Sequence, residues 1–224
     1  MCTRYAIPDQ ETVEAELTPQ RAWWKFQERF NVAPFHSVPV VRLHDGESEG
    51  VVMRWGLIPE WAKGEATAGP GLYAAGGGVE ASRIFGGACR QSQRCLLPLA
   101  GFYIWELTSA RHRQPHFVQF LGRPVFAVAG LWDRSVTEQD DVIESCAMFT
   151  VPANALLSEI QGPGQSMPAI LSPEACRAWL HGRPEEARAL LRTCSAEGML
   201  THPVSPRVNS LKYDDWQLAR AVRA

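Results

Sequence analysis

Cys2 is the residue whose position gives this sequence its most distinctive chemistry. The chain begins MCTRY, and aminopeptidases remove an initiator methionine when the next side chain is small. Removal of Met1 would leave an α-amine and a thiol on adjacent carbons, with typical pKa values of about 7.7–8.0 and about 8.5. Such a pair can condense with an aldehyde to a five-membered thiazolidine, or act as a nucleophile. The alternative interpretation is an incidental cysteine at a frayed terminus.

The other cysteines argue against a metal site, and the net charge argues against a surface for duplex DNA. Cys89, Cys95, Cys146 and Cys176 lie in apolar stretches, where a small buried hydrophobe is the ordinary role of cysteine. The six cysteines form neither a CxxC pair nor a Cys/His metal spacing, so we expect reduced thiols, no metal and no other cofactor. A net charge of −2 argues against a surface for duplex DNA, whereas a few arginines in a groove suffice for a single strand.

Composition and the lack of long apolar segments predict a globular protein with no membrane partner, and the expected reduced thiols predict a cytoplasmic one. Apolar residues make up 46% of the chain and charged residues 21%, which is typical of globular domains. The sequence shows no apolar leader and no stretch long enough to span a bilayer. It also shows no repeat and no linker, so we expect one domain over residues 1–224, and no oligomeric state is indicated.

The elements that position this chemistry are predicted to be many strands with peripheral helices, which is an α+β fold. Strand patterns and their bounding turns occur at 37–43, 50–58, 94–107, 114–132 and 142–151, with a hairpin turn at 121–124. Helical patterns occur at 10–30, 82–90, 153–160, 171–180, 184–193 and near the C-terminus. The helix at 171–180 has the clearest start, because Ser172 is a good N-cap and Pro173 suits the first helical position.

Seven sequence blocks occur together in an order and spacing that point to one family. They are MCTRY, FNVAP (30–34), MRWGLIPEWA (53–62), RCLLPLAGFYIW (94–105), AGLW (129–132), SMPAIL (166–171) and HPVSPRVNS (202–210). Together they resemble the SOS-response-associated peptidase (SRAP) family, the abasic-site-processing proteins. The resemblance implies a mixed, bifurcated or barrel-like β-sheet surrounded by helices, with a groove for single-stranded DNA. It also implies that Cys2 captures the ring-opened aldehyde of an abasic site as a thiazolidine cross-link during the DNA-damage response, and it makes Cys2 the candidate for the family's proposed peptidase activity.

The chain departs from the family at the polar positions that assist this capture. Family members use an asparagine and an arginine in N-A-R-x-E-T, a glutamate in G-F-Y-E-W, and a histidine and an arginine in I-H-x-R-M-P. In this sequence Gly76 and Gly78 stand at the first pair and Ile104 at the glutamate. Gln161 stands at the histidine and Ser166 at the last arginine. The resemblance therefore predicts weakened DNA binding.

Other residues match the family or can substitute for what is lost. The residues expected to contact DNA are Arg4, Asn31, Trp55, Trp105, Gln161, Arg207 and Asn209. Glu106 is the best substitute acid or base, because residues two apart on a strand face the same side, about 6.5–7 Å apart, which brings Glu106 near the space at Ile104. The alternative is a solvated residue at a strand end.

Several further side chains have less specific signals. His36 follows NVAP and could approach the site, although a surface loop is the commoner place for such a histidine. His112 and His116 are expected to be solvated in a hairpin, and packing is the expected role of His202. Glu80 matches a family position but is as well suited to bind its own loop, and Trp61 could stack on a base or pack.

Three functions are compatible with these patterns. The first is Cys2-dependent capture of abasic single-stranded DNA. The second is a non-catalytic module that binds single-stranded DNA or protein. The third is an amidohydrolase with Cys2 as its N-terminal nucleophile.

Overall fold

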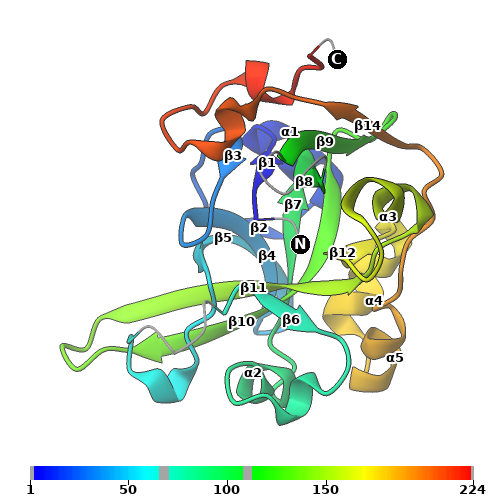
Figure 1. The fold of residues 1–224 in the computed structure, drawn as a ribbon. Helices are drawn as coiled ribbons and strands as arrows, with labels where there is room; N and C mark the ends of the chain where they lie inside the picture. Colours follow the sequence, from blue (N-terminus) through cyan, green and yellow to red (C-terminus); the bar gives the residue numbers. More distant parts are fainter. Residues whose placement is uncertain (1–2, 66–70, 108–112, 223–224) are drawn as a thin grey trace.

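Sheet A contains the first described strand. The computed structural model describes residues 3–65, 71–107 and 113–222. Sheet A has five strands in the order β14-β9-β8-β1-β3 (Figure 1). Its strands are β1 (Tyr5–Ile7), β3 (Arg29–Val32), β8 (Gly101–Leu107), β9 (Arg113–Phe120) and β14 (Met199–Pro203). Because β1 lies between β8 and β3, the first described residues are held on both sides by antiparallel partners.

Sheet B forms a closed five-stranded barrel. Its strands are β4 (Ser37–His44), β5 (Glu47–Trp55), β7 (Arg94–Leu99), β10 (Phe126–Val136) and β11 (Val142–Pro152). The order is β11-β10-β7-β4-β5, and a parallel pairing of β11 with β5 closes the ring. Short strands extend it, namely β2 (Arg21–Ala22), β6 (Tyr73–Ala75), β12 (Ser166–Pro168) and β13 (Ile170–Leu171). The predicted α+β fold with a barrel-like sheet is confirmed.

Short helices surround the barrel. The α-helices are α1 (Gln10–Leu17), α2 (Gly86–Arg90), α3 (Ala155–Gln161), α4 (Pro173–His181) and α5 (Pro184–Ala189). The 3-10 turns are η1 (Glu60–Ala62), η2 (Val79–Ala81), η3 (Pro206–Asn209) and η4 (Trp216–Ala219). Ser172 begins α4 as predicted, because its Oγ accepts a hydrogen bond of 3.3 Å from the N–H of Ala175. Within the described residues, no helix is both long enough and apolar enough to cross a membrane.

The helix predicted at 10–30 is much shorter in the structure. Asp9 caps α1 by accepting from the N–H of Thr12 at 2.9 Å, and the helix ends at Leu17. Thr18 takes the left-handed conformation with φ +40° and precedes Pro19, a position where α-helical backbone is disfavoured. The remainder forms β2, β3 and connecting segments. The predicted polar helix near the C-terminus is likewise only the 3-10 turn η4.

Among the connections that change sheet are those from β7 to β8 and from β9 to β10. After Ala100, the chain leaves β7 in sheet B and enters β8 in sheet A, and it returns to sheet B between β9 and β10. The turn predicted at 121–124 exists, with a bridge between Phe120 and Arg123. The predicted hairpin is nevertheless wrong, because β9 pairs with β8 and β14, whereas β10 pairs with β7, β11 and β13. These crossings produce the bifurcated sheet.

The two faces of β8 point into different apolar clusters. Phe102 and Ile104 face the main core, which they share with the barrel. Tyr103 belongs to a smaller cluster, against which Trp105 packs. The C-terminal segment lies over this second cluster and contributes Val208. This alternation gives Glu106 the barrel side of β8 and Trp105 the C-terminal side.

Candidate active site

The first described strand, β1, has a defined register against β8 and β3. Cys2 lies outside the described residues, and Thr3 is the first residue that the structure describes. Tyr5 is opposite Phe102, and the N–H of Tyr103 donates to the carbonyl of Arg4 at 3.0 Å. Because β1 and β8 are antiparallel, the described part of β1 leads back toward the end of β8 that contains Glu106. The surroundings of that end define the candidate site.

Four predicted DNA-contacting residues meet beside the start of β1, and we call them the N-terminal junction. They are Arg4, Asn31, Trp105 and Asn209. Arg4 donates through Nη1 to Asn31 Oδ1 at 2.8 Å and through Nη2 to the Asn209 carbonyl at 3.4 Å. Trp105 Nε1 donates to Asn209 Oδ1 at 3.0 Å. Residues 205 positions apart are thus held together at the first described strand.

The Asn31 side chain is buried and forms hydrogen bonds within the protein. Only 1% of its surface is accessible. Its Nδ2 donates to the carbonyls of Ser210 at 3.0 Å and Tyr213 at 2.8 Å, while its Oδ1 accepts from Arg4. The side chain therefore positions Arg4 against the C-terminal segment, and in this conformation it has no face for a DNA strand.

Two arginines next to the junction are matched by aspartates. Arg29 Nε lies 2.8 Å from Asp214 Oδ2, and Arg207 Nη2 lies 3.2 Å from Asp215 Oδ2. The Arg207 guanidinium also stacks 4.1 Å from the centroid of the Tyr213 ring. Arg207 therefore lies close to the predicted site, with an adjacent negative charge that weakens its attraction for phosphate.

Glu106 forms a pair with His116 on the barrel side of β8. Glu106 Oε2 and His116 Nε2 are 3.1 Å apart, and Ile104 lies directly opposite His116 in the strand register. The His116 side chain is only 14% exposed, compared with 44% for Glu106, and His116 Nδ1 is buried with no hydrogen-bond partner in the described part of the chain. The prediction that His116 is solvated is therefore wrong. His112 lies outside the described residues.

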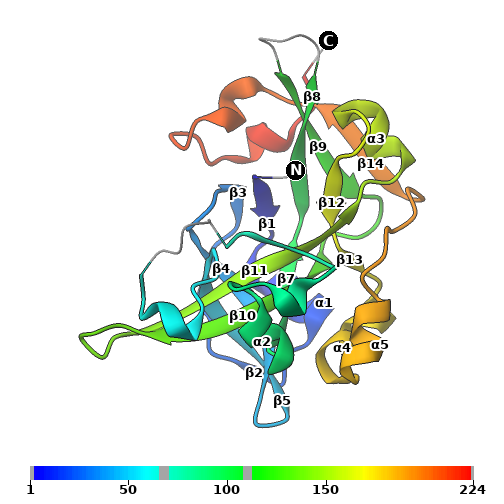
Figure 2. The same cartoon turned by 60° about the horizontal axis from the view of Figure 1, so that its bottom comes forward.

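The diverged family positions are not polar pockets. Ile104 is 1% exposed in the main core. Gln161 ends α3 and is buried, with no partner for Nε2 among the described residues, and α3 packs against β8 (Figure 2). Ser166 pairs with Pro152 in the β11–β12 ladder. The burial of Gln161 corrects the expectation of a surface contact to DNA.

The glycine positions belong to a loop beside α5. A Cβ at Gly76 would lie 3.7 Å from a methyl group of Leu191. Gly78 has φ +75° and precedes η2, and Glu80 forms an ion pair with Arg188. The contact of Glu80 with Arg188 accounts for its position without a role in binding DNA.

The tryptophans divide between core and surface. Trp55 is fully buried, packs edge-to-face on Tyr5 at 5.0 Å between ring centroids, and donates from Nε1 to the Leu72 carbonyl. Its ring has no exposed face in this conformation, which contradicts the expectation that it stacks on a base. Trp61 is 49% exposed, and the Arg83 guanidinium lies 4.6 Å from its ring.

His36 approaches the junction from the loop after β3. Its Nδ1 accepts from the N–H of Ala33 at 3.3 Å. Burial lowers the pKa of His36, and the positive charges of Arg29 and Arg4 lower this pKa further, against the opposite effect of Asp214. The imidazole is therefore biased toward its neutral form beside the junction. His202 instead bonds the Ala219 carbonyl at 2.8 Å, in agreement with a packing role.

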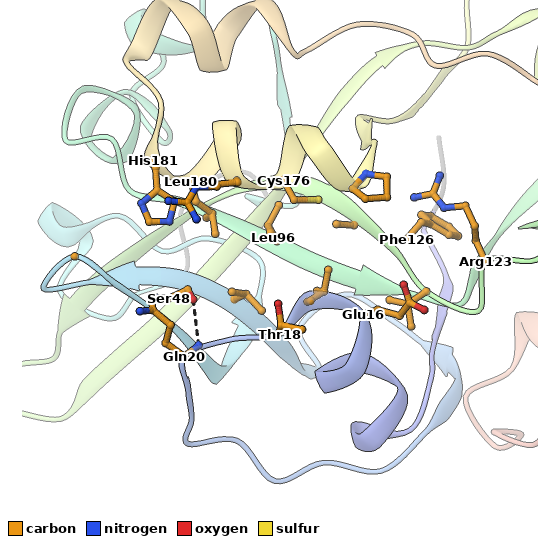
Figure 3. A pocket seen from close by; sticks show the side chains of 17 residues that line it. Glu16, Thr18, Gln20, Ser48, Leu96, Arg123, Phe126, Cys176, Leu180 and His181 are labelled. Atoms are coloured by element: carbon orange, nitrogen blue, oxygen red, sulfur yellow. Dashed lines mark hydrogen bonds between the residues drawn. The ribbon is translucent and has the colours of Figure 1, made fainter.

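A separate groove of about 650 Å³ lies between α1, the β4–β5 turn and α4 (Figure 3). Glu16 and Ser48 line one wall, and Cys176 and His181 line the other. Burial raises the pKa of the Cys176 thiol to about 11, so this thiol is a poor nucleophile near neutral pH. None of the residues that line this groove belongs to the N-terminal junction.

The comparisons with known proteins establish the family. Residues 1–211 match the family described as SOS response associated peptidase (SRAP). Because this match covers most of the 224 residues, the chain belongs to the SRAP family. The fold is also shared with crystal structures of a protein from Bacteroides thetaiotaomicron (TM-score 0.87, 22% identity, 99% of this chain and 100% of the other) and of one from Bordetella bronchiseptica (TM-score 0.79, 22% identity, 91% and 100%).

Abasic site processing proteins of three organisms are each identical to this chain at about a quarter of the aligned positions. The chain is 28% identical to the abasic site processing protein YoaM of Bacillus subtilis, over 88% of this chain and 86% of the relative. It is 27% identical to the abasic site processing protein YedK of Escherichia coli, over 87% and 85%. It is also 27% identical to the abasic site processing protein HMCES of Gallus gallus, over 85% and 65%.

Proposed function

We propose that this protein acts on abasic sites in single-stranded DNA and captures them covalently through Cys2. Membership of the SRAP family and the names of the relatives support this role. The observation in the structure that supports it most is the N-terminal junction, in which β3, β8 and the C-terminal segment converge on Arg4. That convergence holds the residues adjoining Cys2 in one place. A cytoplasmic location is part of the proposal.

The proposed reaction needs no external oxidant or reductant. After hydrolysis of Met1, the Cys2 amine attacks the aldehyde carbon of the open sugar, and loss of one water gives an imine. The thiol then adds to the imine carbon, and its proton moves to nitrogen, which closes the thiazolidine. Each step requires a proton to leave or to enter at a defined atom, so a positioned acid–base group accelerates the sequence.

We assign that proton transfer to Glu106, with His116 as its partner. Glu106 lies on the same face of β8 as Ile104, about 6.5–7 Å further along the strand, at the end toward which β1 leads back. A carboxylate there can take a proton from the attacking amine and return it to the departing hydroxyl. His116, 3.1 Å away, orients this carboxylate and can share its proton.

Phosphate contacts in this proposal are fewer than in the family. Gly78 and Ser166 stand where the family has arginines, and each lost contact removes a charge-assisted hydrogen bond. Arg4 remains at the junction. Binding should therefore be weaker and should show a shallow dependence on salt, since each neutralised phosphate of a single strand contributes a slope of about 0.7.

The test is a cross-linking time course with Met-processed protein and a uracil-excised single strand, read as a gel-stable adduct. We expect wild type to form the adduct and Cys2→Ala to form none. We expect Glu106→Gln to slow formation by at least about 100-fold, while Glu138→Gln, a change at an exposed residue in the β10–β11 turn, leaves the rate unchanged. An equal yield with Cys2→Ala would refute the nucleophile, and an unchanged rate with Glu106→Gln would refute the acid–base assignment.

One observation favours a second candidate function, which is binding of single-stranded DNA without chemistry. Ile104 is buried at the position of the family's acid, and Gln161 is buried at the position of its histidine. Neither side chain exchanges protons near neutral pH, so a domain that had lost catalysis could retain both replacements. Measurable affinity for a single strand, with no adduct from Met-processed protein over long incubation, would establish this function in place of capture.

A further inference from the structure

Phe35 is an exposed aromatic residue in a strained backbone conformation. It lies between β3 and β4, directly after Pro34, and 52% of its surface is accessible. Its φ is +72°, in the left-handed region, where a bulky side chain is a clear outlier. An exposed phenyl ring contributes nothing to the core that would offset this strain, so the position requires another explanation.

The loop that holds Phe35 is fixed by backbone hydrogen bonds. The N–H of Phe35 donates to the Trp55 carbonyl at 2.8 Å, and the N–H of Trp55 donates to the His36 carbonyl at 2.9 Å. The N–H of His36 donates to the Ala33 carbonyl at 3.2 Å. The ring is therefore presented from a fixed support at the end of β5. A preorganised ring loses little conformational freedom when a ligand stacks on it.

The Arg54 guanidinium lies over one face of this ring, and we call the two side chains the platform. Its guanidinium carbon lies 4.5 Å from the Phe35 centroid, within the range of a cation–π contact. Its Nη1 donates to the Gly56 carbonyl, and no carboxylate among the described residues forms an ion pair with it. Arg29 and Arg207 each form an ion pair with an aspartate, whereas the positive charge of Arg54 has no such partner among the described residues.

The platform adjoins the N-terminal junction. His36 follows Phe35 in the chain, and the charges of Arg4 and Arg29 act on its imidazole. Trp55, which follows Arg54 in β5, packs on Tyr5 of β1 with 5.0 Å between ring centroids. The neighbours of Phe35 and Arg54 thus connect the platform to the junction and to β1.

We propose that Phe35 and Arg54 form a stacking site for one base of single-stranded DNA, with Arg54 also binding the adjacent phosphate. The inference rests on the proposed function for the class of ligand. The geometry suits a single strand because its unpaired bases expose a π face, which a fixed aromatic ring accepts irrespective of base identity. The site supplies affinity that the chain lacks where Gly78 and Ser166 replace arginines.

The test measures equilibrium binding of a fluorescent oligo-dT strand that contains no abasic site, so that no covalent chemistry contributes. We expect Phe35→Ala to weaken binding about 10-fold and Phe35→Trp, which keeps an aromatic ring, to bind as wild type does. We expect Arg54→Gln to weaken binding and to reduce the slope of log K against log salt by about 0.7. Trp23→Ala is the matched control, because Trp23 is 69% exposed and its N–H bonds Gly50, four residues before Arg54 on β5.

Phe35→Gly separates stacking from folding. Glycine takes positive φ without strain, so this variant should raise Tm by about 3 °C while still weakening binding about 10-fold. The inference is overturned if Phe35→Ala binds as wild type, if Trp23→Ala weakens binding equally, if Phe35→Gly lowers Tm together with affinity, or if wild type binds no strand. A Phe35-dependent affinity in a protein that forms no adduct would retain this site and reject the capture reaction. Adduct formation with unchanged Phe35→Ala binding would do the reverse.

Discussion

Replacement of Asn31 by alanine should destabilise the protein more than most polar-to-alanine changes. Asn31, in β3, is 1% exposed and joins three segments, since it accepts from Arg4, just before β1, and donates to the carbonyls of Ser210 and Tyr213 in the C-terminal segment. Alanine removes all three hydrogen bonds. The Ser210 and Tyr213 carbonyls and the Arg4 guanidinium each lose a hydrogen-bond partner, in a space with little access to water.

The magnitude follows from the types of these hydrogen bonds. The two neutral bonds contribute about 1 kcal/mol each and the charged one about 2 kcal/mol, so the free energy of unfolding should fall by about 4 kcal/mol. In a domain of this size each kcal/mol corresponds to about 3 °C, which predicts a fall in Tm of about 12 °C. Asn31→Asp should also destabilise, because its second carboxylate oxygen faces the Ser210 and Tyr213 carbonyls.

Urea unfolding and thermal scans of wild type, Asn31→Ala and Asn154→Ala form the assay. Asn154 is a second buried asparagine, and it caps α3 by accepting from the N–H of Leu157 at 3.0 Å. Its replacement should cost about 1–2 kcal/mol, which sets the scale for an ordinary buried asparagine. An Asn31→Ala protein within 2 °C of wild type, taking about 12 °C as the expected fall, would refute the claim that Asn31 holds the junction together.

Two further predictions concern ionisation. Burial and the charge of Arg29 lower the pKa of His36 below its ordinary value of 6.5, so below that pH the unfolded chain binds more protons than the folded one. The free energy of unfolding should therefore decline as pH falls from about 6.5 through the lower folded-state pKa. Urea titrations of His36→Gln at several pH values should lack this component of the decline. Burial raises the pKa of the Cys95 and Cys146 thiols, so iodoacetamide at neutral pH should label both only after unfolding; mass spectrometry showing rapid labelling of either thiol in the native protein would contradict their burial.

Local sequence signals predict the barrel strands and the start of α4 well. The β-branched runs at 37–43, 50–58 and 142–151 became β4, β5 and β11, because such residues suit a pleated surface. The alternation in VVMRW also indicates which of its side chains face the core. Val51, Met53 and Trp55 share the buried face, so the period of two already indicates that Trp55 is a core residue and that Arg54 faces outward.

Contacts between distant segments could not be predicted in the same way. The passage of β7 into β8 and of β9 into β10 depends on which strands pair, and local propensity does not specify the partner. The Glu106–His116 contact requires the register of the β8–β9 hairpin. Asn31 meets residues about 180 positions later in the chain, so its burial follows from the path of the C-terminal segment. Phe35 and Arg54 stand out only when ring exposure, φ and the guanidinium distance are known together.

The most direct test of the central claim is an intact-mass measurement of the protein before and after incubation with a single strand that contains one abasic site. We expect a protein that lacks Met1, and an adduct whose mass equals protein plus strand minus one water, with the attachment mapped to Cys2. A Met-processed protein that forms no adduct, or one whose adduct maps to another residue, would contradict it.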